Sequence, residues 1–133
     1  MKLTLSNPAG VAAPFAAAYA NVARVDTGDG ALLFLAGQVA IDDAGNVVAP
    51  GHIVAQAERV FDIIGGLLAA HGATFGDVLH VRTFLTSLDD LPGYRVVRRK
   101  VFPTEPPAST TVAVSGLVLP GAVVEIEVTA AVP

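Results

Sequence analysis

The chain has 133 residues, of which 53% are apolar and 15% are charged, and its formal net charge is −4. This length and composition indicate a single globular domain over residues 1–133 and exclude an intrinsically disordered chain. The acidic balance argues against nucleic acid as the main partner, and the absence of cysteine excludes disulfides, thiolate metal sites and a cysteine nucleophile.

No run approaches about 18 uninterrupted apolar residues, the length that a membrane-spanning helix needs. The first eight residues, Met1 to Pro8, also lack the long apolar core of a secretory signal. We therefore expect a cytoplasmic protein with no membrane partner.

The first half of the chain predicts a β-hairpin followed by a long helix. Residues 21–25 alternate as a half-buried strand does, and residues 31–36 form a short apolar run, with a turn rich in Gly and Asp between them. From Ile53 to His71, apolar residues recur in steps of three and four, which is typical of an amphipathic helix. The Gly65-Gly66 pair inside this helix predicts the close approach of a crossing strand.

The second half predicts three strands and one more helix. The strands are expected over residues 77–85, 109–114 and 122–132, and the helix runs from Pro92 to about Val101. The order β-β-α-β-α-β-β indicates an α+β domain in which a mixed sheet carries two helices on one face. Its other face would be too apolar to lie in water, so we expect a dimer or trimer that buries it.

The paired carboxylates of the last predicted strand are the first candidates for chemistry. Glu125 and Glu127 are two residues apart, so both side chains point to the same face of the sheet. Neighbouring carboxylates repel each other and can raise the pKa of one of them, which suits a group that orients water or moves a proton. A merely solvated face is the alternative.

Gln38 and the hydroxyls that follow a proline-rich loop are the other polar candidates. The Gln38 amide can satisfy two backbone groups, and Ser109 and Thr111 begin a strand where hydroxyls could bind a ligand. Ordinary structural roles stay open for all three. No metal and no cofactor are predicted, because there is no phosphate-binding glycine loop and the histidines lack metal-ligand spacing. These histidines are His52, His71 and His80.

Several short motifs resemble one known family when they are taken together. They are Ala36-Gly37-Gln38-Val39, Asp43-Ala44-Gly45, Gly51 to Gln56, Pro107-Ala108-Ser109-Thr110 and Val124 to Ala130. In this order they resemble the reactive intermediate deaminase (Rid, YjgF-type) family over nearly the whole chain. The resemblance implies a chorismate-mutase-like homotrimer with ligand clefts between its subunits. In the best-studied branch these clefts hydrolyse enamines or imines to 2-keto acids and ammonia.

The chain departs from that branch at the position that binds the substrate. Ser109 stands where the branch has an arginine that holds the substrate carboxylate, so the chain resembles a branch without this residue. Glu125 and Tyr19 have counterparts in the family's cleft. Losing a bidentate, charge-assisted contact predicts weak or absent activity on 2-aminoacrylate. Arg95 is the first candidate for a substitute cation and Arg24 the second.

These observations predict a hydrolytic deaminase of a small imine, an enamine or a related metabolite, acting without a cofactor. Glu125 would orient the water. The ligand would be bound by Ser109, Thr111, Arg95, Tyr19 and Gln38. A non-catalytic, small-molecule-binding homotrimer with the same clefts is the alternative. A third hypothesis is a protein-interaction or ribonuclease role, which the acidic balance and the lack of a basic aromatic patch disfavour for RNA.

Overall fold

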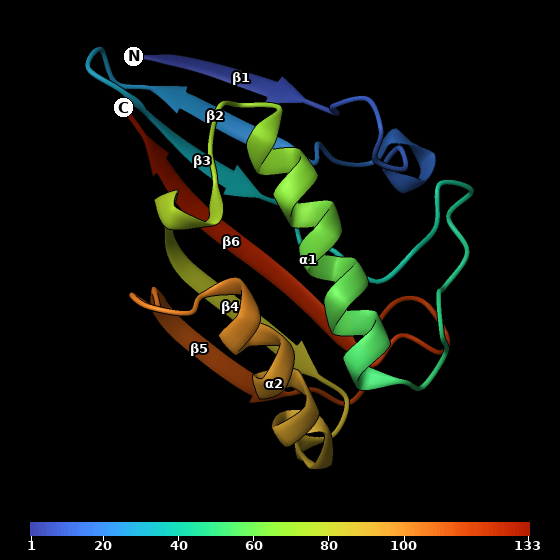
Figure 1. Cartoon of the computed structure of the whole chain (residues 1–133). Coiled ribbons are helices and arrows are strands. Elements are labelled where there is room, and N and C mark those ends of the chain that lie inside the picture. The colour runs from blue at the N-terminus through green and yellow to red at the C-terminus, as the bar shows by residue number, and fades with distance from the viewer.

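The computed structural model describes every residue from Met1 to Pro133 and contains one six-stranded sheet with two helices packed on one face (Figure 1). The strands are β1 (Lys2–Ser6), β2 (Val22–Asp26), β3 (Ala31–Leu35), β4 (Val78–Leu85), β5 (Ala108–Ala113) and β6 (Val124–Val132). The helices are α1 (Ile53–Ala69) and α2 (Leu91–Val101), and the short 3-10 turns are η1 (Phe15–Ala17), η2 (Phe75–Asp77) and η3 (Leu88–Asp90).

The strand order across the sheet is β1-β2-β3-β6-β4-β5. Only β4 and β5 run parallel to each other, so the sheet is mixed, and the predicted α+β class with both helices on one face is confirmed. The structure adds β1 to the predicted order. Its two leucines, Leu3 and Leu5, are each 63% exposed on an edge strand. Residues 2–6 alternate polar and apolar side chains, so β1 carries the local period-two pattern of a strand although none of its residues is buried.

Alternation along the strands separates a helix-covered face from an open face. In β6 the side chains of Val124, Ile126 and Val128 are fully buried under the helices, and Glu125 and Glu127 point to the other face. The predicted hairpin is also confirmed, since β2 and β3 pair antiparallel. The core between sheet and helices includes Val22, Leu33, Leu35, Val60, Ile64, Leu67, Leu68, Val81, Leu85, Tyr94 and Val97.

The glycine pair in α1 does not mark a strand crossing, and that prediction is wrong. A Cβ built on Gly65 would meet the ring of Phe75 at 3.3 Å, and one on Gly66 would have no neighbour within 4 Å. The close approach is therefore made by an aromatic side chain of η2. This ring also packs edge-on against Phe61 of α1, with centroids 6.1 Å apart.

Gln56 is fully buried in the first turns of α1 and joins the helix to two loops. Its Nε2 donates to the carbonyl oxygens of Val48, Ala49 and Gly121 at 3.2, 3.2 and 2.9 Å. Its Oε1 accepts from the backbone N–H of Val123 at 2.9 Å. Because β6 starts at the next residue, this amide determines where that strand begins.

The first prediction concerns this amide. Gln56→Leu keeps the side-chain size but leaves the Val123 N–H and the Val48 carbonyl without partners in a dry site, while the Ala49 and Gly121 carbonyls keep one backbone hydrogen bond each. We expect the free energy of unfolding to fall by about 2–4 kcal/mol, measured by urea denaturation. The matched change Glu58→Leu, on the exposed side of the same helix, should stay within about 0.5 kcal/mol of the wild type. Equal effects of the two changes would contradict this role of Gln56.

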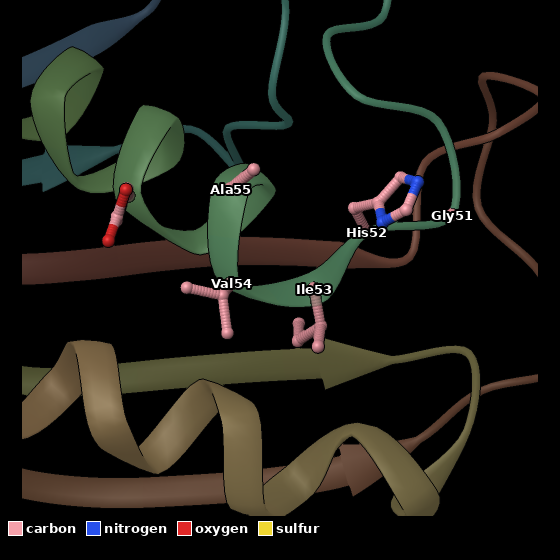
Figure 2. Close-up of a pocket in the computed structure, with 6 residues that line it drawn as sticks. Gly51, His52, Ile53, Val54 and Ala55 are labelled. Carbon is pink, nitrogen blue, oxygen red and sulfur yellow. The ribbon is translucent and has the colours of Figure 1, made fainter.

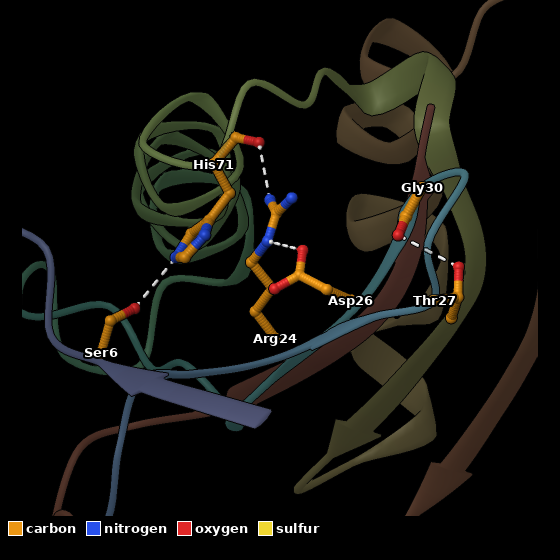
Figure 3. A network of polar contacts seen from close by, with 6 residues as sticks. All are labelled: Ser6, Arg24, Asp26, Thr27, Gly30 and His71. Carbon is orange, nitrogen blue, oxygen red and sulfur yellow. Dashed lines mark hydrogen bonds and ion pairs between the residues drawn. The ribbon is translucent and has the colours of Figure 1, made fainter. Parts of the chain in front are cut away.

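A polar network ties β1 and β2 to the end of α1 (Figure 3). The His71 ring Nε2 lies 2.9 Å from the Ser6 hydroxyl, and Arg24 donates to the His71 carbonyl at 3.4 Å. Arg24 also pairs with Asp26 at 2.9 Å. Burial, and then the positive charge of Arg24, lower the pKa of His71 below its ordinary value. The folded chain therefore favours the neutral imidazole.

This shift makes the stability of the fold dependent on pH. The pKa of His71 is lower in the folded chain than the ordinary value of 6.5, so unfolding takes up a proton when the pH falls below that value. The stabilisation is present above pH 6.5 and is lost on acidification through the folded pKa. We expect His71→Gln to lose less stability than the wild type between pH 7 and pH 5 in denaturant titrations. The exposed His52→Gln should behave as the wild type does.

Candidate functional site

Glu125 lies on the open face of the sheet, at the beginning of β6. Its carboxyl group packs directly over Gly37, the residue that follows Ala36 at the end of β3. A Cβ on Gly37 would lie 3.0 Å from Cδ of Glu125 and 3.1 Å from its Cγ and Oε1. A side chain at position 37 would therefore require the Glu125 side chain to shift.

The electrostatic surroundings of Glu125 favour its protonated form. Burial, and then the charge of Glu127 on the same face, raise the pKa of Glu125 above its ordinary value. The carboxylate of Glu127 is itself neutralised by Arg82, whose Nε donates to Oε1 at 2.6 Å. The prediction that Glu125 and Glu127 point to the same face of the sheet is therefore confirmed. Of these two carboxylates, only Glu125 has no cation beside it.

Arg82 is a charged residue of this face that sequence reasoning did not single out. Besides Glu127, its guanidinium donates to Nδ1 of His80 at 2.8 Å and to the Thr129 hydroxyl at 3.1 Å. These contacts run across β4 and β6, whose register pairs Arg82 with Glu127. The only sequence signal for them is the alternation of the two strands, and it does not predict which strands are neighbours.

Gln38 is buried, with 6% of its surface exposed, and its amide serves the fold. Its Nε2 donates to Oδ1 of Asn21 at 3.3 Å and to the carbonyl of Ala36 at 3.1 Å. Its backbone exchanges two hydrogen bonds with Ile126. These bonds hold Gly37 beside Glu125. Direct binding of a ligand by Gln38 stays a prediction.

Ser109 and Thr111 lie on the helix-covered face of β5, not on the face of Glu125. Their register partners on β4 are Val81 and Thr83, which are buried under the helices. The Ser109 hydroxyl accepts from Nη1 of Arg98 on α2 at 3.2 Å. Within one chain, these hydroxyls are therefore separated from Glu125 by the sheet and by the intervening strand β4.

The remaining predicted ligand-binding residues do not meet Glu125 within the chain either. Tyr19 is 50% exposed in the segment between η1 and β2. Arg95 points outward from α2, exposed and without a hydrogen bond to the protein. Arg24, the second candidate cation, is engaged by Asp26 on the helix-covered side. The structure thus brings together Glu125 and Gly37, and separately Ser109 and Arg98.

Two surface depressions of the single chain lie away from these residues. One opens at the beginning of α1 and is lined by Gly51, His52, Ile53, Val54, Ala55 and Glu58 (Figure 2). Another lies between α1 and α2, and no predicted site residue lines either of them. No group of three or more His, Asp or Glu side chains is placed to hold a metal ion. None of the helices combines the length and the apolar character needed to cross a bilayer.

The next prediction concerns the coupling between the two carboxylates. Glu127→Gln removes the negative charge beside Glu125 and frees the Arg82 guanidinium, and both effects favour the ionised form of Glu125. We expect the pKa of Glu125 to fall in a ¹³C NMR titration of the side-chain carboxyl groups. Asp29→Asn, in a distant exposed turn, should leave that pKa unchanged. An unchanged or higher pKa in Glu127→Gln would show that this charge does not act on Glu125.

Comparison with known proteins places this geometry in a family. A family model described as Endoribonuclease L-PSP matches residues 11–132. Protein DfrA of Myxococcus xanthus is 39% identical over 99 residues, covering 74% of each chain. The 3-aminoacrylate deaminase RutC of Acinetobacter baylyi is 34% identical over 95 residues, covering 71% of this chain and 75% of that protein.

Comparison with solved structures leads to the same family as the sequence comparisons. The crystal structure of YyfA from Yersinia pestis, a member of the conserved Rid protein family, superimposes with a TM-score of 0.88 at 27% identity. The superposition covers 98% of this chain and all of that one. The resemblance drawn from the short motifs is therefore confirmed, and this chain belongs to the YjgF/Rid family.

Proposed function

We propose that this protein is a hydrolytic deaminase of small imines or enamines, with Glu125 as the catalytic residue. The observation that carries the proposal is a carboxyl group with a raised pKa, packed over a glycine and left without a cation on an open face. A family member at 34% identity is described as a 3-aminoacrylate deaminase, which acts on an enamine.

The chemistry needs a group that gives and takes protons near neutral pH. The imine nitrogen first takes a proton, and water adds to the carbon of this iminium while Glu125 accepts one of the water protons, which gives a neutral carbinolamine. Glu125 returns that proton to the nitrogen, which leaves as ammonia while the carbonyl forms and the hydroxyl proton is released, so that the proton taken up at the start is given back. An enamine reaches the same iminium by taking a proton on carbon. The sum is one imine and one water giving one carbonyl compound and one ammonia.

The proposed site lies between subunits of a homotrimer. Glu125 and the pair Ser109 and Thr111 occupy opposite faces of one sheet, so a small ligand reaches both sets only when they come from different copies. The open face also carries large apolar side chains, among them Leu3, Leu5, Phe34 and Val112, which are 42–63% exposed. Burying this apolar surface is a driving force for association.

We propose that 2-aminoacrylate is not the preferred substrate, because β5 presents Ser109 where an arginine would hold a carboxylate directly. The same substitution favours a second candidate function, a homotrimer that binds a small molecule and leaves it unchanged. Catalytic turnover separates the two functions. An RNA-cleaving role has less support from the charge, since the chain carries 12 acidic residues against 8 Lys and Arg.

The deaminase proposal predicts a specific loss on substitution of Glu125. Imino acids generated in place by an amino-acid oxidase should release ammonia and keto acid faster with the wild type than in buffer. Glu125→Gln should slow this step about 10²- to 10⁴-fold, the usual contribution of a proton-transferring group. Its melting temperature should not fall, because the carboxyl group makes no hydrogen bond within the chain.

The control is Asp62→Asn, an exposed carboxylate on α1 that should keep wild-type rates. The alternative outcome is that the wild type fails to accelerate the hydrolysis of any imino acid. If a small molecule then raises the melting temperature of the protein and is itself recovered unchanged, the non-catalytic function replaces the deaminase.

A further inference from the structure

The two carboxyl groups of β6 share a face of the sheet but lie in opposite surroundings. The register of β4 and β6 pairs Glu127 with Arg82 and pairs Glu125 with Phe84. On its other side Glu125 packs over Gly37. One carboxylate therefore faces a guanidinium, and the other lies beside an aromatic side chain and a glycine. Surroundings that differ in this way separate two carboxyl groups into one that stays ionised and one that exchanges protons.

The guanidinium that faces Glu127 is fixed by all three of its nitrogen atoms. Nε of Arg82 donates to Glu127 at 2.6 Å, and Nη2 donates to the Thr129 hydroxyl at 3.1 Å. Nη1 lies 2.8 Å from Nδ1 of His80. Because a guanidinium only donates, Nδ1 must accept, and the proton of the neutral ring lies on Nε2, which faces the Thr110 hydroxyl at 3.4 Å. Arg82 is thus held from β4 and β6 together.

Glu127 is the charged neighbour that acts on Glu125. The charged or titratable strand residues of the open face are His80, Arg82, Glu125 and Glu127. The segments that flank Glu125, residues 36–41 and 114–123, contain no acidic or basic residue. Asp89 and Asp90, which follow β4, belong to η3 at the start of α2. The charge of Glu127, after burial, is also what raises the pKa of Glu125.

We propose that Arg82 is a positioning residue for the proposed reaction: it binds the ionised Glu127 carboxylate, so that Glu125 alone gives and takes the proton. This inference rests on the proposed function and deepens it. Residues 125 and 127 are about 7 Å apart along the strand, a distance that two free glutamate side chains can close. Without Arg82 the two carboxyl groups would share one proton, and transfer within the pair would compete with transfer to the substrate.

The first test removes the cation and follows Glu125 as a function of pH. In Arg82→Gln the negative charge of Glu127 is no longer neutralised, so ionisation of Glu125 becomes less favourable. We expect the pKa of Glu125 to rise by about one unit in a ¹³C NMR titration. The acid limb of the pH profile of kcat/KM for imine hydrolysis should rise with it, because Glu125 must be ionised to accept a proton from water. Below that limb the rate should fall about tenfold.

Two controls separate this role from a structural one. Arg82→Lys keeps the positive charge beside Glu127 and should return the acid limb most of the way to its wild-type position. Arg59→Gln removes an arginine of similar exposure, since the Arg59 and Arg82 side chains are 30% and 32% exposed and both pair with a carboxylate. Arg59 pairs with Asp43, so its loss should leave the pKa of Glu125 unchanged.

A charge swap keeps the inference testable if Arg82→Gln does not fold. Arg82→Glu combined with Glu127→Arg preserves an ion pair between β4 and β6 but places the cation next to Glu125 on its own strand. The pKa of Glu125 and the acid limb should then fall below their wild-type values. The inference is overturned if folded Arg82→Gln leaves both unchanged, or if the swapped pair titrates Glu125 as the wild type does.

The NMR titration needs no substrate, so this inference and the deaminase fail separately. If the wild type hydrolyses imines and Arg82→Gln has the wild-type acid limb, the deaminase stands and the role of Arg82 falls. If the pKa of Glu125 responds to Arg82 as expected but no imine is hydrolysed, the control of Glu125 by the ion pair stands and the deaminase falls.

Discussion

The side-chain amide of Gln56 holds together the parts of the chain that bring Glu125 to its place. It bonds to the 48–49 loop and to both Gly121 and Val123, the segment that leads into β6. A one-residue slip of β6 would turn Glu125 into the core and a valine into water. The position of Glu125 on the open face therefore depends on a fully buried amide.

The sheet divides the candidate site residues into two sets, and this division shapes the proposed function. Glu125 with Gly37 lies on the open face, and Arg98 with Ser109 lies at the β5 edge under α2. The strands β6 and β5 are two inter-strand spacings apart, about 10 Å, with β4 between them. A small ligand cannot span that distance across a sheet, so we expect a second copy to complete each site.

The candidate site was predictable only in part, and the helix α2 shows why. Tyr94 and Val97 are three residues apart, as on one side of a helix, and both are buried. Arg98 lies about 40° around the helix from Tyr94, whereas Arg95 lies about 100° away. This spacing alone indicates that Arg98 flanks the buried side. Its contact with Ser109 was not predictable, because nothing in the sequence states that α2 packs beside β5.

The amino-acid sequence by itself determined the α+β class, the two helices, the hairpin and the shared face of Glu125 and Glu127. Those features depend on local periodicity, which each segment carries in its own residues. Only the tertiary structure decided that β6 lies between β3 and β4, that Arg82 neutralises Glu127, and that Arg98 rather than Arg95 meets Ser109. These contacts join residues far apart in the chain, and their formation depends on the packing of whole elements rather than on any local pattern.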